Sequence, residues 1–94
     1  MTIEPTAILS VTDDAIASDV DGEVVLISIA SSRYFGFDRI GSEIWRRLQT
    51  PKTFDALCTE LKAACEGDPA TIERETGDFV TKLMERGLVR ESVA

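Results

Sequence analysis

The sequence predicts an α+β fold in which a three-stranded antiparallel sheet packs on a three-helix bundle. Three observations support this prediction. Runs rich in β-branched and aromatic residues fill the N-terminal part, the apolar period changes from two to about 3.6 residues near Asp38, and the later segments begin and end with helix caps and breakers. At 94 residues, we expect a single domain spanning 1–94, with 1–6 as a flexible N-terminus.

Three strands are expected before Asp38. Residues 8–12 alternate between two faces, 24–29 form a nearly continuous β-branched run, and 33–37 are rich in aromatic residues. The polar segment 13–23 ends in an Asp-Gly turn signal and is expected to be a loop. Because a three-stranded sheet with one apolar face is not stable uncovered, the helices that follow have to supply the other half of the core.

The first two helices are marked by breakers and caps. The first is expected over about 39–48, with Asp38 as its candidate cap, and ends before Pro51, because proline disfavours helical geometry in the preceding residue. Gly41 lies in its first turn at a cost of about 1 kcal/mol relative to alanine, and a close approach of the backbone to the sheet would explain this glycine. The second helix begins at a Thr53 cap and ends near Gly67.

The third helix is expected to begin at an Asp68 cap with Pro69 in the first helical position, and to stop at Gly87. Its apolar stripe is unusually wide and consists of Ile72, Thr76, Phe79, Val80, Leu83 and Met84. Either this helix packs between two elements, or one flank is left for a partner. Residues 88–89 either add a short terminal strand or cover the end of the bundle.

Composition argues against catalysis. The chain has no histidine and no glycine-rich phosphate loop, so we predict no catalytic residue, no metal site and no cofactor. Cys58 and Cys65, if on one helix, are separated by about 10.5 Å of rise, beyond the roughly 7 Å limit for a disulfide, and are predicted to be reduced packing residues. No membrane span or signal peptide is apparent, so we expect a soluble, cytoplasmic protein.

The net charge of −7 is unevenly distributed, because residues 33–52 hold five bases against two acids. These bases are Arg33, Arg39, Arg46, Arg47 and Lys52. They form either a solvated face or a patch that steers an acidic partner. Binding to nucleic acid is disfavoured, because a strongly acidic chain lacks the broad basic surface that neutralises phosphates.

Several segments together resemble the PqqD-like family of RiPP recognition elements, which are small winged helix-turn-helix-like domains. The resemblance covers roughly residues 20–90. It rests on Tyr34-Phe35-Gly36-Phe37-Asp38, Gly41, Ile44-Trp45, Leu48, Thr53, Leu57, Leu61, Phe79-Val80, Leu83 and Gly87-Leu88-Val89.

The resemblance implies a non-catalytic protein that binds the leader region of a ribosomally made precursor peptide. The leader would add a strand to the edge at 33–37 and lie against the third helix. The implied peptide-binding residues are Arg33, Tyr34, Phe35, Gly36, Phe37, Thr76, Phe79, Val80, Leu83 and Met84. For the aromatic residues of the strand, core packing is an equal alternative.

The implied partners are the enzymes of a lasso-peptide pathway, a transglutaminase-like cysteine protease and an asparagine-synthetase-like cyclase. The alternative is a radical-SAM peptide-modifying enzyme, with the chain acting as its peptide chaperone. A winged-helix DNA-binding protein is a third and weaker interpretation. Neither nucleic acid nor a membrane is expected as a partner.

Overall fold

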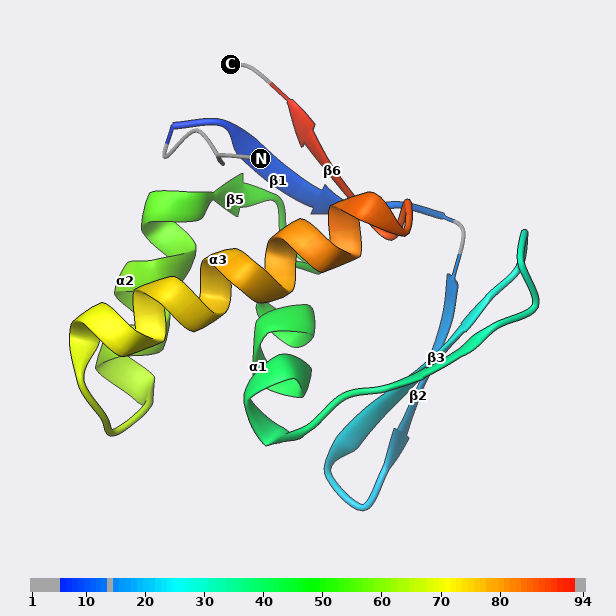
Figure 1. Cartoon of the computed structure of the whole chain (residues 1–94), viewed down its shortest axis with the longest axis horizontal. Coiled ribbons are helices and arrows are strands. Elements are labelled where there is room, and N and C mark those ends of the chain that lie inside the picture. Colours follow the sequence, from blue (N-terminus) through cyan, green and yellow to red (C-terminus); the bar gives the residue numbers. More distant parts are fainter. Residues whose placement is uncertain (1–5, 14, 93–94) are drawn as a thin grey trace.

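The computed structural model describes residues 6–13 and 15–92 (Figure 1). The flexible segment expected at 1–6 therefore lies, except for Thr6, outside the described residues. In this part of the chain three helices pack with two three-stranded antiparallel sheets, so the predicted α+β class is confirmed. The elements are β1 (Ile8–Val11), β2 (Ala15–Val20), β3 (Glu23–Ser28), β4 (Tyr34–Gly36), α1 (Arg39–Arg47), β5 (Lys52–Thr53), α2 (Phe54–Ala64), α3 (Pro69–Glu85) and β6 (Val89–Ser92).

The prediction of a single sheet was wrong in one respect, because the strands divide between two sheets. The loop expected over 13–23 contains β2, which pairs with β3 along its full length from Ala15 opposite Ser28 to Val20 opposite Glu23. The Asp-Gly signal forms the tight turn of this hairpin, and both of its residues have positive φ, as such turns require.

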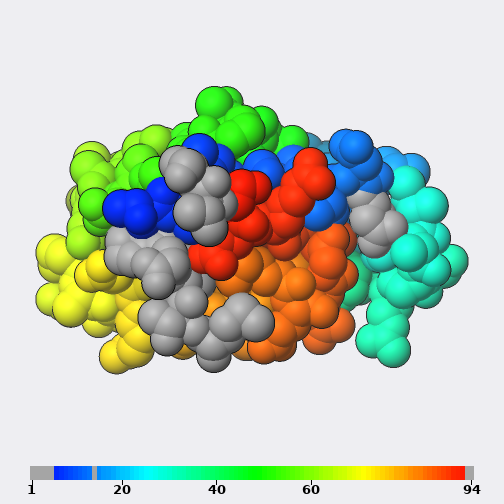
Figure 2. Space-filling view, turned by 90° about the horizontal axis from the view of Figure 1, so that it is seen from above, coloured from blue at the N-terminus to red at the C-terminus, as the bar shows by residue number. Residues whose placement is uncertain are grey.

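The second sheet joins segments that are far apart in the sequence. Strand β1 lies between β5 and β6, with Leu9 opposite both Lys52 and Glu91. Figure 2 shows β1 in blue and β6 in red running side by side across one face of the molecule. The terminal strand considered for 88–89 therefore exists as β6, whereas β1 does not belong to the sheet that contains β3.

The predicted helix caps are confirmed. The Asp38 carboxylate accepts a hydrogen bond from the Gly41 N–H at 2.8 Å, and the Thr53 hydroxyl accepts one from the Ala56 N–H at 3.0 Å. Asp68 caps α3, with proline in the first helical position. No helix in the described part of the chain is both long and apolar enough to cross a membrane.

The core lies between the helices and the inner faces of both sheets. Its fully buried members include Leu9, Leu26, Ile44, Leu48, Leu57, Leu61, Val80 and Leu88. Cys58 is buried among them and Cys65 is half-buried, and both are free cysteines. Burial raises the pKa of the Cys58 thiol to about 11, so this thiol stays protonated at neutral pH.

A buried hydroxyl joins α1 to the β2–β3–β4 sheet. Ser42 Oγ accepts a hydrogen bond from the Val24 N–H at 2.7 Å and is 3.4 Å from the Phe37 carbonyl oxygen, to which it donates. The Phe37 N–H donates directly to the Val24 carbonyl at 2.9 Å. In a regular antiparallel pair both bonds would be direct. Here the bond from the Val24 N–H to the Phe37 carbonyl is replaced by two hydrogen bonds through the Ser42 hydroxyl.

Ser42→Ala is therefore expected to lower the free energy of unfolding by about 1–3 kcal/mol, because a buried N–H and a buried carbonyl lose their partner. The matched control is Ser18→Ala on the exposed face of β2, with an expected change within about 0.5 kcal/mol. Urea unfolding followed by Trp45 fluorescence measures both variants. Equal midpoints for Ser42→Ala and the wild type would contradict this role.

Candidate functional site

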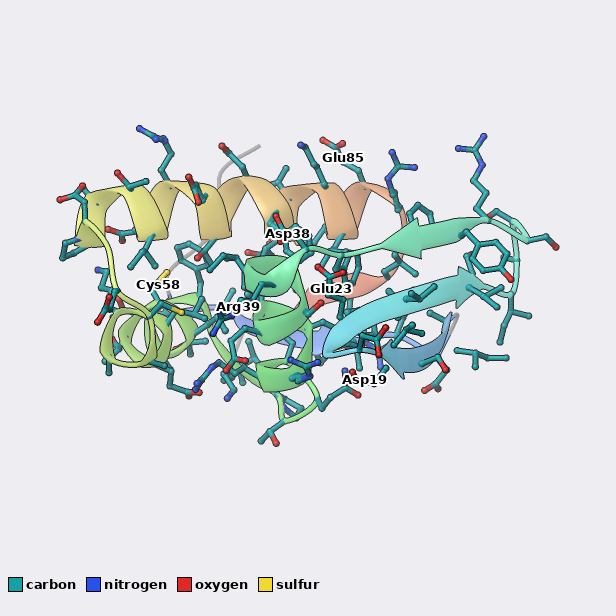
Figure 3. All side chains as sticks on the ribbon, turned by 90° about the horizontal axis from the view of Figure 1, so that it is seen from below. Asp19, Glu23, Asp38, Arg39, Cys58 and Glu85 are labelled. Atoms are coloured by element: carbon teal, nitrogen blue, oxygen red, sulfur yellow. The ribbon has the colours of Figure 1, made fainter. Side chains whose placement is uncertain are left out.

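Strand β4 is an edge strand. The order of its sheet is β2–β3–β4, and β3 occupies only one side of β4. Arg86, just past the C-terminal end of α3, lies over Phe35 of this strand, and Figure 3 shows the strand next to that end of the helix. Among the described residues no strand pairs with the opposite side of β4, so its outward main-chain groups are open to a further strand.

Two hydrogen bonds fix which main-chain groups point inward. The Ser28 N–H donates to the Arg33 carbonyl, and the Phe37 N–H donates to the Val24 carbonyl, both at 2.9 Å. Residues directly opposite each other in an antiparallel ladder alternate between bonded and non-bonded pairs. The groups of Phe35, midway between Arg33 and Phe37, therefore face β3.

By the same alternation, the main-chain groups of Tyr34 and Gly36 point away from β3. The open edge thus offers two N–H donors and two carbonyl acceptors. A Cβ added at Gly36 would meet nothing within 4 Å, so the outer face of the strand is open at this position. These four groups are what a short peptide strand needs for pairing.

The aromatic side chains of this segment alternate between the two faces of the sheet. Tyr34 is 74% exposed on the outer face. Phe35 is half-buried against the core, and Phe37 is buried with its ring centroid 5.0 Å from that of Phe79 and 6.0 Å from that of Trp45. Core packing is therefore the main role of Phe37, whereas Tyr34 faces solvent.

One flank of α3 faces β4. The Arg86 guanidinium, just past the end of α3, lies 5.1 Å from the centroid of the Phe35 ring, and the Phe79 ring packs edge-on against Phe37. The helical repeat places exposed Lys82 between Phe79 and Arg86. The wall beside the open edge is thus formed by Phe79, Lys82 and Arg86, which we call the β4 flank.

This arrangement revises the expected groove wall. Thr76, Val80 and Leu83 are buried beneath the β4 flank, so their side chains are not accessible from the edge. Met84 is two turns after Gly77 and shares its direction, and Gly77 faces Phe54 of α2. Met84 therefore belongs to the opposite flank. The wide stripe is explained by packing of α3 between two neighbours.

Lys82 and Arg86 were missed by the sequence analysis, because the groove wall was sought among apolar residues. Their spacing from Phe79, three and seven residues, was the available signal. It could not be used without knowing which flank of α3 meets β4.

The predicted basic patch is largely neutralised by ion pairs with acidic residues from distant parts of the chain. Arg46 pairs with Asp19 at 2.7 Å, and Arg47 and Lys52 both pair with Glu60 at 3.0 Å. The hydrogen bond from Lys52, followed by that from Arg47, lowers the pKa of Glu60. Among the five bases, only Arg33 and Arg39 make no ion pair within the described residues.

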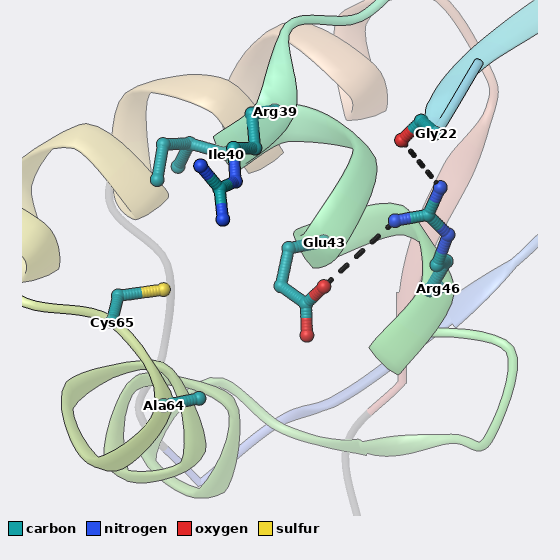
Figure 4. A pocket seen from close by; sticks show the side chains of 7 residues that line it. All are labelled: Gly22, Arg39, Ile40, Glu43, Arg46, Ala64 and Cys65. Atoms are coloured by element: carbon teal, nitrogen blue, oxygen red, sulfur yellow. Dashed lines mark hydrogen bonds and ion pairs between the residues drawn. The ribbon is translucent and has the colours of Figure 1, made fainter. Parts of the chain in front are cut away.

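The hollows on the surface lie elsewhere. Figure 4 shows a mainly polar hollow of about 350 Å³ between α1 and the end of α2, into which the Arg39 side chain extends. Arg46 forms its far wall by donating to the Gly22 carbonyl at 2.7 Å. The candidate site at β4 is an edge with one flanking helix and not an enclosed cavity.

A sheet with an open last strand beside the third helix of a small bundle defines a winged-helix-like α+β domain. The family described as coenzyme PQQ synthesis protein D (PqqD) matches residues 23–89, from the start of β3 to the start of β6. The chain belongs to this family and is a PqqD-like RiPP recognition element.

Two solved structures are similar to this chain. The first is TbiB1 in complex with the TbiA(beta) leader peptide, with 31% sequence identity, a TM-score of 0.78, and coverage of 86% of this chain and 94% of that chain. The second is lasso peptide synthetase B1 complexed with the leader peptide, with 21% identity, a TM-score of 0.75, and coverage of 87% and 96%. No match was found among curated proteins.

Two glycines test the assignment of the flanks. A Cβ at Gly41 would lie 2.9 Å from Cε1 and Cζ of Phe79, so the close approach expected at this position is to α3 and not to the sheet. Gly41→Ala is expected to destabilise by about 1 kcal/mol net, because overlap costs roughly 1–3 kcal/mol against a gain of about 1 kcal/mol in helix propensity.

Gly77→Ala is the control in the interior of α3. Its Cβ would lie 3.6 Å from Cζ of Phe54, an ordinary contact, so a stabilisation of about 1 kcal/mol is expected. Thermal and urea unfolding measure both variants. The same sign for the two changes would show that the flanks are assigned incorrectly.

Proposed function

We propose that this protein binds the leader region of a ribosomal precursor peptide by strand addition to β4, and presents the peptide to modifying enzymes without catalysing a reaction itself. The observation that carries this proposal is the open edge at Tyr34 and Gly36 beside the β4 flank of α3. It is supported by the two similar structures, both of which are complexes with leader peptides.

The chemistry of the edge suits an extended peptide. Four outward main-chain groups can form four hydrogen bonds, each contributing about 0.5–1.5 kcal/mol net. A peptide antiparallel to β4 would place alternate side chains over Phe35 and Arg86 on the inner face and beside Tyr34 on the outer face. With these apolar contacts we expect micromolar affinity or better, corresponding to about −8 kcal/mol.

The charge beside the edge favours acidic side chains in the leader. Lys82 and Arg86 lie on the β4 flank, and Arg33 precedes the strand. None of the three forms a side-chain ion pair within the described residues. Since exposed charge pairs contribute about 0–1 kcal/mol each, these residues affect the choice of leader and its association rate more than its affinity.

Presentation without catalysis agrees with the residues available. The Cys58 thiol is buried and protonated, and the chain has no histidine to activate a nucleophile. Incubation of the protein alone with its precursor peptide is expected to leave the peptide unchanged.

The partner enzymes that we propose are the transglutaminase-like cysteine protease and the asparagine-synthetase-like cyclase of a lasso-peptide pathway. One of the two similar structures is a lasso peptide synthetase B1 complexed with the leader peptide, which favours this pathway over a radical-SAM enzyme. The genes adjacent to this one distinguish the two pathways. No observation favours DNA binding, because most of the basic patch is paired with acidic residues.

Gly36→Pro tests strand addition directly. Proline removes an outward N–H without touching the bonds to β3, so the affinity for the leader is expected to fall about tenfold or more. Gly36→Ala retains the N–H, has room for its Cβ, and is expected to bind nearly as the wild type does. Calorimetry with the leader and a scrambled control measures both. Unchanged affinity in a folded Gly36→Pro variant would exclude pairing at this edge.

The β4 flank is tested by Arg86→Ala, which removes a cation and the cover over Phe35. Leader affinity is expected to fall about three- to tenfold, as for the loss of about 0.6–1.4 kcal/mol. Arg74→Ala is the matched control, because Arg74 is an exposed arginine of α3 that lies more than three helical turns before Arg86 along the axis. Equal effects of the two variants would mean that only net charge matters.

A further inference from the structure

The β2–β3–β4 sheet has a second open edge, at β2. Strand β3 occupies one side of β2, and among the described residues no strand pairs with the other side. The Val24 carbonyl accepts a hydrogen bond from the residue that follows β4, so the main-chain groups of Val25 face β2, where Val25 lies opposite Ser18. The main-chain groups of Ala17 and Asp19, on either side of Ser18, therefore point away from the sheet.

An apolar groove lies between this edge and the C-terminal end of α1. Its volume is about 270 Å³, and its lining consists of Ala17, Ser18, Asp19, Val24, Trp45, Arg46 and Gln49. Val24 and Trp45 are buried and form its floor. Ala17 lies opposite the buried Leu26, on the inner face of the sheet, and is nevertheless exposed. The space beneath Ala17 is thus not filled by the protein's own side chains, and we call this surface the β2 groove.

The end of the β2 groove next to the β2–β3 turn is acidic. Asp19, Asp21 and Glu23 are exposed there, and among the described residues that line the groove Arg46 is the one base. Arg46 pairs with Asp19 at 2.7 Å, whereas Asp21 and Glu23 form no ion pair within the described part of the chain. Arg39 extends into the hollow on the other side of Arg46. Two uncompensated carboxylates at this end favour a cationic partner.

A second copy of this chain does not have that chemistry at the same edge. Strand β2 consists of small and aliphatic residues with one aspartate, and it contains no base. In a symmetric antiparallel pair Ala17 would lie opposite the partner's Ala17, so two methyl groups would occupy the groove and leave it largely empty. The occupant that fits is therefore a different polypeptide, with basic residues and a larger apolar side chain.

We propose that the β2 groove binds an extended, positively charged segment of a partner protein, which pairs with β2 as an additional antiparallel strand. The outward main-chain groups of Ala17 and Asp19 supply the pairing. The residue of the segment that lies opposite Ala17 points to the inner face, where a large apolar side chain covers Val24 and Trp45. An antiparallel segment reaches the acidic turn before it reaches Ala17, so its basic residues precede the apolar one.

This site is separate from the edge at β4, because β3 lies between the two edge strands. Neighbouring strands are about 4.8 Å apart, so β2 and β4 are separated by roughly 10 Å, and a strand can be added at each edge at the same time. The inference at β2 does not depend on the function proposed for β4.

The acetylated and amidated heptapeptide Lys-Thr-Lys-Val-Leu-Thr-Thr serves as the probe. Its leucine is designed to lie opposite Ala17 and its second lysine opposite Asp19. NMR titration of the isotope-labelled full chain is expected to shift the signals of Ala17, Val24 and the Trp45 indole at millimolar concentrations. The signal of Gly36 is expected to stay in place, because the basic residues beside β4 repel the lysines. Shifts at β4 rather than at β2, or no shifts at all, would overturn the proposal.

Two matched peptides test the chemistry of the groove. Replacing both lysines by glutamate is expected to weaken binding about three- to tenfold, because attraction to the acidic end becomes repulsion. Replacing the leucine by serine is expected to weaken binding about tenfold, because the groove then buries no large apolar side chain. Equal affinities for the three peptides would show pairing without recognition by the groove, and would contradict the assignment.

Three variants assign the contacts. Ala17→Pro removes an outward N–H without breaking a bond to β3 and is expected to weaken the probe about tenfold or more, whereas Ala17→Ser retains the N–H and is expected to bind as the wild type does. Asp21 has a positive φ, which asparagine tolerates, so Asp21→Asn remains informative if Ala17→Pro fails to fold. It is expected to weaken the lysine peptide about two- to threefold and not the glutamate peptide. Unchanged affinity in folded Ala17→Pro, or equal weakening of both peptides in Asp21→Asn, would exclude the proposed contacts.

Two further measurements decide between occupants. Sedimentation of the chain alone is expected to show a monomer, and a dimer that the probe dissociates would assign the β2 groove to a second copy. A leader peptide bound to the wild type is expected to leave the probe at β2. Displacement of the probe, with loss of its shifts at Ala17 and Trp45, would assign the groove to the leader instead of a partner protein.

Discussion

The placement of β4 depends on the buried hydroxyl of Ser42. It connects the Val24 N–H to the Phe37 carbonyl, where a regular ladder would have a direct bond. The end of the β3–β4 ladder is thereby fixed to the first turn of α1, which the Asp38 cap also orients. As a result, the direction of the open edge is set by a helix residue within the core.

The position of α3 follows from its packing between two neighbours. Val80 and Leu83 fill the core, Gly77 approaches α2, and Phe79 packs over Gly41 against Phe37. With both flanks constrained in this way, the helix has little freedom to rotate about its axis. The polar residues that follow Phe79 along the same flank are consequently held beside β4, where they border the edge without contributing to the core.

Local features were predictable from the sequence, whereas non-local pairings were not. The caps at Asp38, Thr53 and Asp68 depend on bonds within three residues and were read correctly. Strand β2 was not predicted, because the polar residues Ser18 and Asp19 interrupt the alternation of apolar and polar residues. The strand is stabilised by its pairing with β3, which is not visible in the local sequence. The open edge was predicted, but three of the residues predicted for the groove wall, Thr76, Val80 and Leu83, are buried in the core. Which residues line the groove is not a local property. It depends on which neighbour meets each flank of α3, a tertiary property that helical periodicity does not contain.

If a peptide pairs with β4, the two faces of the extended sheet place different demands on it. Main-chain pairing at Tyr34 and Gly36 is indifferent to sequence, so selection has to come from side chains. On the inner face those side chains meet Phe35, which is half-buried against the core and cannot move without a packing cost, and Arg86, which covers the Phe35 ring. On the outer face Tyr34 is exposed and leaves room for many residue types. Peptide positions whose side chains face α3 should therefore accept few residue types. The positions between them, whose side chains face the outer side of the sheet, should accept many.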